Sequence, residues 1–220
     1  MKVRAVITGA TGMVGEGVLL ECLSNPDVEQ VLVLNRKPCG VSHAKLTEVL
    51  CPNFMDLSAI ESKLQNYNAC FFCMGVSSIG MTEAQYTSLN YDIPLNVAKV
   101  LSRLNNDMVF CFVSGAGTNG NEQSKSMWVR VKSRAENDLM KLPFKKAYMF
   151  RPGYMQPTKG AKNTIKMYNY VKWMYPLLRV AFPKAACSLQ EVGIAMIHTV
   201  TKGYEKNCFE VKDIVELAKH

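Results

Sequence analysis

The chain has 220 residues, the size of one domain with a single sizeable core. Hydrophobic residues make up 48% and charged residues 20%, which excludes a disordered, collagen-like or coiled-coil chain. The 26 Lys and Arg against 18 Asp and Glu give a formal net charge of +8. This charge favours anionic partners such as phosphates, nucleic acid or membrane surfaces, without choosing among them.

Apolar residues predict strands and helices that alternate along the first 153 residues. The first expected strand is residues 3–8 and the first helix residues 13–24, which Asn25 and Pro26 end. Further strands are expected at 30–34, 46–50, 69–74, 108–113 and 147–151, and helices at 57–67, within 83–104 and at 127–142. This order predicts an α/β fold with a doubly wound parallel sheet covered by helices on both faces.

After residue 153 the amino-acid composition changes, and residues 163–182 are rich in aromatic and basic residues. Residues 188–201 have the spacing of an amphipathic helix, and a last strand and helix are expected within 208–218. We predict a single domain over residues 1–220, with 154–187 as a small substrate-covering insertion over the sheet edge. Its basic and aromatic part, residues 162–179, is interpreted as a lid over a small-molecule substrate. A surface for nucleic acid or lipid headgroups is the alternative, although no nucleic-acid motif accompanies it.

The cysteines and the N-terminal sequence indicate in which cellular compartment the protein is expected. Eight cysteines lie scattered through apolar segments, and no secretory signal precedes the first strand, so we expect a reduced, cytoplasmic protein. Cys70 and Cys73 form a C-x-x-C pattern, but positions i and i+3 of a strand point to opposite faces. The three histidines have no metal-ligand spacing, and no uncharged run is long enough to cross a bilayer. We therefore predict no metal site and no transmembrane segment.

The first expected strand ends in a glycine-rich turn, residues 8–15, with the sequence TGATGMVG. Gly9 permits the tight turn, Gly12 lets the backbone approach a pyrophosphate, and Gly15 lets the following helix pack on the strand. The N-terminus of that helix attracts an anion. The turn therefore predicts a dinucleotide-binding site, to which we also assign Thr11, Met13 and Val14.

This turn resembles that of the short-chain dehydrogenase/reductase superfamily, in its extended and atypical branch with the pattern T-G-x-x-G-x-x-G. Within that branch the chain looks like the NAD-dependent epimerase-like and Tat-interacting-protein-like oxidoreductases. The resemblance covers about residues 1–153 and implies a Rossmann fold. It also implies that Asp56 and Leu57 lie beside the adenine, and that Gly75 flanks the ribose and nicotinamide. Pro152 and Gly153 would lie by the carboxamide.

The choice of dinucleotide depends on the end of the second expected strand. NAD-selective sites place an acidic residue there to bind the ribose hydroxyls. This chain has Asn35, Arg36 and Lys37 instead. The planar guanidinium of Arg36 suits a phosphate, and no carboxylate is present to repel one. We therefore predict NADP as the cofactor with NAD as the alternative; a solvated basic pair on a loop would explain the same residues.

The catalytic residues implied by the resemblance are incomplete. Family members carry a Tyr and a Lys four residues apart on one helix, and a Ser after the fifth strand. Lys132 and Ser114 match these positions, but Trp128 stands where the tyrosine is expected. An indole N–H has no proton to exchange near neutral pH and cannot serve as a general acid or base. Another tyrosine could relay the proton, or water could supply it; Tyr86, Tyr91 and Tyr154 are the candidates by position.

Two functions remain open at this point. The first is an NADP-dependent reductase or epimerase-like enzyme that acts on a small carbonyl or sugar-like substrate. The second is a non-catalytic NADP-binding regulatory or interaction protein, which the tryptophan at position 128 favours. Either would be a monomer or a homodimer.

Overall fold

The computed structural model describes residues 1–164, 175, 177, 179, 182 and 184–219. Its centre is a seven-stranded sheet in the order β3-β2-β1-β4-β5-β6-β9, in which every neighbouring pair is parallel. The strands are β1 (Val3–Thr8), β2 (Val28–Asn35), β3 (Leu46–Leu50), β4 (Ala69–Phe72), β5 (Val109–Val113), β6 (Lys146–Arg151) and β9 (Cys208–Glu210).

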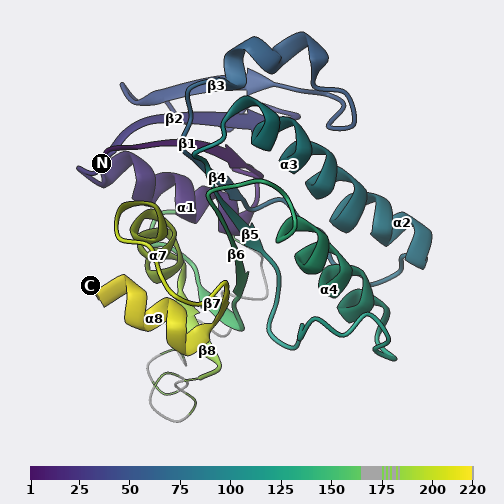
Figure 1. The fold of residues 1–220 in the computed structure, drawn as a ribbon. Coiled ribbons are helices and arrows are strands. Elements are labelled where there is room, and N and C mark those ends of the chain that lie inside the picture. Colours follow the sequence, from purple (N-terminus) through teal and green to yellow (C-terminus); the bar gives the residue numbers. More distant parts are fainter. Residues whose placement is uncertain (165–174, 176, 178, 180–181, 183, 220) are drawn as a thin grey trace.

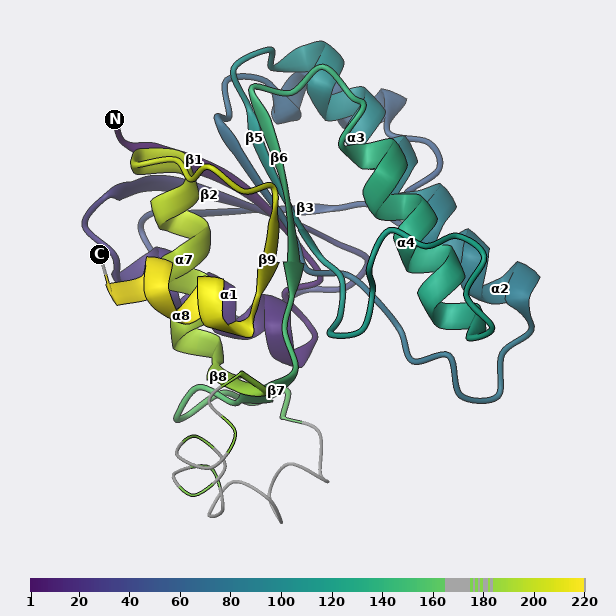
Figure 2. The same ribbon diagram turned by 60° about the horizontal axis from the view of Figure 1, so that its bottom comes forward.

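Helices cover both faces of this sheet (Figures 1 and 2). One face carries α1 (Met13–Ser24), α7 (Leu189–Thr201) and α8 (Val211–Lys219). The other carries α2 (Glu83–Thr87), α3 (Ile93–Leu104) and α4 (Met127–Leu139). Each layer of helices buries its own apolar cluster against the sheet, because strands of a parallel sheet are apolar on both faces. The prediction of a doubly wound α/β fold of Rossmann type is confirmed.

The strand order reverses between β1 and β4. From β1 the chain moves outward through β2 and β3, and then returns to place β4 on the other side of β1. The loops that follow β1 and β4 therefore leave the sheet in opposite directions and open a crevice at their carboxyl ends.

Two helical segments differ from the expectation. Residues 57–67 contain a short 3₁₀ helix, η1 (Ser58–Leu64), in place of an α-helix. The long helix within 83–104 is divided by a π-helical turn, η2 (Ser88–Asp92), that separates α2 from α3. Pro94 in the first turn of α3 lacks an amide proton and cannot bond the carbonyl of Asn90, so an α-helical ladder cannot run through this point.

The segment 154–187 is tied together at its two ends. A short two-stranded sheet pairs β7 (Tyr154–Gln156) with β8 (Ala186–Ser188). Most of the basic and aromatic stretch 162–179, which we interpreted as a lid, lies outside the described residues. The lid and the single-domain boundaries therefore stay predictions.

Cys70 and Cys73 lie on opposite faces of the sheet, as expected from their spacing. Cys70 belongs to the apolar cluster under α3 and α4, whereas Cys73 packs against the cluster under α1 and α7. Within the described part of the chain, no three His, Cys, Asp or Glu side chains come together as metal ligands. No helix among the described residues is long and apolar enough to cross a membrane.

Candidate functional site

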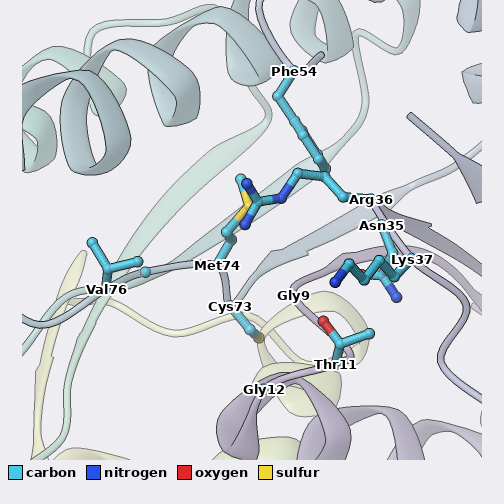
Figure 3. Close-up of a pocket in the computed structure, with 11 residues that line it drawn as sticks. Gly9, Thr11, Gly12, Asn35, Arg36, Lys37, Phe54, Cys73, Met74 and Val76 are labelled. Atoms are coloured by element: carbon cyan, nitrogen blue, oxygen red, sulfur yellow. The ribbon is translucent and has the colours of Figure 1, made fainter. Parts of the chain in front are cut away.

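A cleft of about 440 Å³ opens at the carboxyl ends of β1, β2 and β4 (Figure 3). It lies at the crevice that the strand order creates. Its lining combines the glycine-rich turn, the end of β2 and the residues after β4: Gly9, Thr11, Gly12, Asn35, Arg36, Lys37, Phe54, Cys73, Met74, Gly75 and Val76.

Close backbone packing explains two of the three glycines. Gly9 has a φ of 73°, and a Cβ atom there would lie 2.8 Å from the backbone nitrogen of Met74. A Cβ atom on Gly15 would clash with the carbonyl of Gly9. Gly12, by contrast, faces the cleft. Gly9 and Gly15 thus allow the close backbone contacts of the turn, whereas the lack of a side chain at Gly12 leaves room for a ligand in the cleft.

The first turn of α1 offers unpartnered amides. Gly12 is the N-cap and supplies no side-chain cap. The amides of Met13, Val14 and Gly15 donate no hydrogen bond to any described residue, whereas the amide of Glu16 bonds the Gly12 carbonyl at 2.9 Å. Consecutive free amides at the positive end of a helix are a binding site for an anion.

Asn35 holds the turn in place, a role that the sequence reasoning missed. This buried side chain at the end of β2 accepts a hydrogen bond from the Ala10 amide at 3.1 Å. Its amide nitrogen Nδ2 has no partner among the described residues. A buried donor without a partner is costly and fits a site that is completed by a ligand. A polar residue that ends an apolar strand was the available sequence signal.

Arg36 and Lys37 bring positive charge to this cleft. Both side chains are exposed, and neither forms an ion pair or hydrogen bond with another described residue. Figure 3 shows the Arg36 side chain reaching from the end of β2 toward Met74. Two unpaired cations therefore lie beside the anion-binding turn.

A second, smaller hollow of about 100 Å³ adjoins the cleft and shares Arg36 and Gly75 with it. Pro52, Asn53 and Phe54 form one side of this hollow. The expected residues Asp56 and Leu57 do not line it. The Asp56 carboxylate accepts hydrogen bonds from the amide and hydroxyl of Ser58, and Leu57 is buried in the core. The chain turns before these two residues, since the Asp56 amide donates to the Asn53 carbonyl at 3.2 Å. Their expected place beside the adenine stays a prediction.

Lys132 is buried beside Gly75. Its Nζ donates to the carbonyls of Val113 and Ser114 at 3.1 and 3.4 Å. A Cβ atom on Gly75 would lie 3.8 Å from this Nζ and 3.5 Å from Oδ1 of Asn90, a buried oxygen without a partner among the described residues. Burial lowers the pKa of Lys132 to about 8, against the opposing effect of Glu136. The amine and the amide oxygen thus face the same end of the cleft.

Ser114 begins a chain of buried polar contacts. Its hydroxyl lies 3.3 Å from that of Thr118, which donates to the Glu136 carboxylate at 2.8 Å. Glu136 is fully buried and pairs with Arg151 at 2.6 Å. This network fixes the loop that carries Ser114.

Trp128 packs against that loop. A Cβ atom on Gly115 or Gly117 would lie 3.6 or 3.4 Å from its ring. Of the alternative tyrosines, Tyr91 donates to Asp138 at 2.8 Å and Tyr154 to Gln156 at 2.9 Å. Burial raises the pKa of Tyr86 to about 12. None of the three lines the cleft.

Pro152 and Gly153 do not line the cleft either. The Pro152 carbonyl accepts the Ala116 amide at 2.9 Å. Gly153 lies so close to the carbonyl of Ala185 that a Cβ atom would clash with it. Close chain packing thus accounts for this glycine, and the structure gives no support for its expected place by the carboxamide.

Residues 5–142 match the model of the NAD-dependent epimerase/dehydratase family, and the chain belongs to that family. Its relatives include "Protein FMP52-1, mitochondrial" of Scheffersomyces stipitis, 24% identical over 98% of both chains. Another is "Protein FMP52, mitochondrial" of Candida glabrata, 26% identical over 94% of this chain and 88% of the relative.

Solved structures support the same fold. The enzyme WbmG of Bordetella bronchiseptica in complex with NAD superposes with a TM-score of 0.68 at 14% identity, covering 99% of this chain and 77% of the other. A glucuronic acid dehydrogenase from Chromohalobacter salexigens gives 0.68 at 17% identity, covering 95% and 76%.

The expected cytoplasmic location is wrong, because the relatives that match nearly the whole chain are named mitochondrial proteins. Free cysteines do not distinguish among the compartments inside the cell.

Proposed function

We propose that the chain binds NADP in the cleft and acts as a reductase or epimerase-like enzyme on a small carbonyl or sugar-like substrate. The observation that carries this proposal is that one cleft is lined by Gly12, the N-cap of α1, and by the unpaired Arg36 and Lys37. The free amides of Met13, Val14 and Gly15 follow Gly12 directly, although these residues do not themselves line the cleft. The amides of Met13 and Val14 suit a pyrophosphate. Arg36 suits an additional phosphate on the adenosine ribose. No described residue that lines the cleft carries a carboxylate to oppose it.

The residues present fit a dinucleotide. The Nδ2 of Asn35 and the free amides are hydrogen-bond donors without an acceptor among the described residues, which a cofactor would supply. The smaller hollow beside Phe54 suits the adenine ring. NADP would supply a hydride donor and acceptor. Lys132 would bind the nicotinamide ribose, because it lies beside Gly75 at the cleft's end. Ser114 would donate a hydrogen bond to the substrate oxygen.

Cofactor titration tests this proposal. We expect NADPH to bind more tightly than NADH to the wild-type chain, as followed by calorimetry. The Arg36→Ala variant should lose most of that preference, about tenfold or more for a charge-assisted phosphate contact. Arg103→Ala, which removes an equal charge from a surface pair with Glu61, serves as the control. An unchanged ratio of the two affinities in Arg36→Ala would refute the role of Arg36.

A non-catalytic NADP-binding protein is the second candidate, and Trp128 favours it. General acid–base assistance is typically worth about 100- to 10,000-fold in rate, and an indole supplies none. NADPH oxidation measured against aldehydes, ketones and quinones separates the two functions, since binding without oxidation supports the second. Trp128→Tyr should create or increase turnover, while Trp128→Phe should not. Equal rates in both variants would show that position 128 does not supply the proton.

A further inference from the structure

A second concave surface lies beside α8 and shares no lining residue with the cofactor cleft. This α8 groove has a volume of about 410 Å³. Helix α8 packs near the β7–β8 pair (Figure 2). The groove is lined by Arg179, Lys184, Lys212, Val215, Glu216 and Lys219.

The charge in the α8 groove is unbalanced. Its described lining residues include four cations and one carboxylate, that of Glu216. Lys184, Lys212 and Lys219 are exposed and form no ion pair with any described residue, whereas nearby Lys206 pairs with Asp213 at 2.7 Å. Like charges about 10 Å apart in water repel by about 0.4 kcal/mol. An anion would relieve this repulsion.

The lining cations come from two parts of the chain, α8 and the pair Arg179 and Lys184. Lys212, Glu216 and Lys219 lie at i, i+4 and i+7 of α8 and share one helix face, so the two lysines are about 10 Å apart along the axis. Arg179 is fixed by the Ala186 carbonyl at 2.7 Å and by Glu191 at 2.5 Å. Glu191 already balances the charge of this arginine, so the lysines supply the uncompensated charge.

We propose that the α8 groove binds phosphate groups. Lysine ammonium groups are point charges that suit phosphate oxygens without a fixed geometry, and two lysines a turn or two apart can hold linked phosphates. The ligand is either a soluble polyphosphate or the headgroup of an anionic phospholipid. Leu177 and Phe182 are 63% and 61% exposed and lie within two residues of Arg179 and Lys184 in the chain, which gives the lipid a route of contact.

Titration with inorganic pyrophosphate, with the cofactor cleft saturated by NADPH, tests for a soluble ligand. Lys212→Glu/Lys219→Glu should weaken binding about tenfold or more, and Glu216→Gln should strengthen it, because the groove then loses its only acidic side chain among the described lining residues. Lys63→Glu/Lys99→Glu changes the net charge equally on η1 and α3, whose apolar residues belong to the cluster on the other face of the sheet, and should leave binding unchanged. The variants' NADPH affinity should equal that of wild type, which separates this proposal from the cofactor assignment.

Sedimentation with vesicles tests the lipid source. Phosphatidylcholine vesicles with phosphatidic acid should bind the chain, and vesicles without it should not. Binding to these vesicles alone, lost in the α8 variant and kept in the control, assigns the groove to headgroups. The proposal is overturned if neither pyrophosphate nor anionic vesicles bind, or if the α8 variant and Glu216→Gln bind them as wild type does.

Discussion

Burial of the Lys132 ammonium makes the stability of the chain depend on pH in an unusual direction. Its pKa falls from a usual 10.5 to about 8, chiefly through burial. The unfolded chain therefore binds more protons than the folded chain between these values, and stability rises with pH across that window. Below about pH 8 the folded state carries the full cost of a buried cation, about 3 kcal/mol for this shift.

Replacement of Lys132 by Met removes that cost. The variant also loses the hydrogen bonds to the carbonyls of Val113 and Ser114, each worth about 1 kcal/mol. Lys132→Met should thus be about 1 kcal/mol more stable than wild type at pH 7. At pH 10 most of the wild-type cost has vanished, so the variant should become about 1 kcal/mol less stable.

Urea unfolding of the cofactor-free chain at pH 7 and pH 10 measures both differences. Lys63→Met, at an exposed position, is the matched control and should differ little from wild type at either pH. A Lys132→Met difference that is the same at both pH values would refute the reasoning, because it would mean that the amine is not buried as a cation.

Two further predictions concern packing. Glu136→Leu should lower the free energy of unfolding by about 3–5 kcal/mol, because it leaves the mostly buried Arg151 without its main partner. The double variant Glu136→Leu/Arg151→Met should recover most of that loss. Equal melting temperatures of the single and double variants would contradict this prediction. Gly153→Ala should destabilise the chain, since its Cβ atom would clash with the Ala185 carbonyl, whereas Gly115→Ala, whose Cβ atom would make an ordinary contact at 3.6 Å with Trp128, is the comparison. A melting temperature for Gly153→Ala equal to that of wild type would show that the two segments do not approach so closely.

The central strands β4 and β5 were predictable because each is a short, fully buried apolar run. The expected first helix, residues 13–24, coincides with α1. The helices at 57–67 and within 83–104 were less well predicted, because apolar spacing does not distinguish a 3₁₀ or π-helical turn from an α-helix. The π-helical turn follows from one residue, Pro94, and its missing amide.

The sequence predicted the parts of the candidate site that depend on backbone geometry. It did not predict the parts that depend on tertiary contacts. Glycine spacing located the turn, and Arg36 and Lys37 do line the cleft. For Asn35 the sequence offered only a polar residue at the end of an apolar strand, and its contact with the Ala10 amide depends on how the end of β2 approaches the turn. Phe54 had no such signal, because its place beside the hollow depends on the chain after β3. Asp56 instead accepts hydrogen bonds from the amide and hydroxyl of Ser58, two residues further on, a local contact that aspartate often makes.

The central claim is that the free amides at the start of α1 bind a pyrophosphate. Titration of NADPH into isotope-labelled protein, followed by amide NMR shifts, tests it most directly. We expect the largest shifts at Gly12, Met13 and Val14, with further shifts at Arg36 and at the Asn35 side chain. Absence of any shift at millimolar NADPH, or shifts confined to residues outside the cleft, would contradict the account.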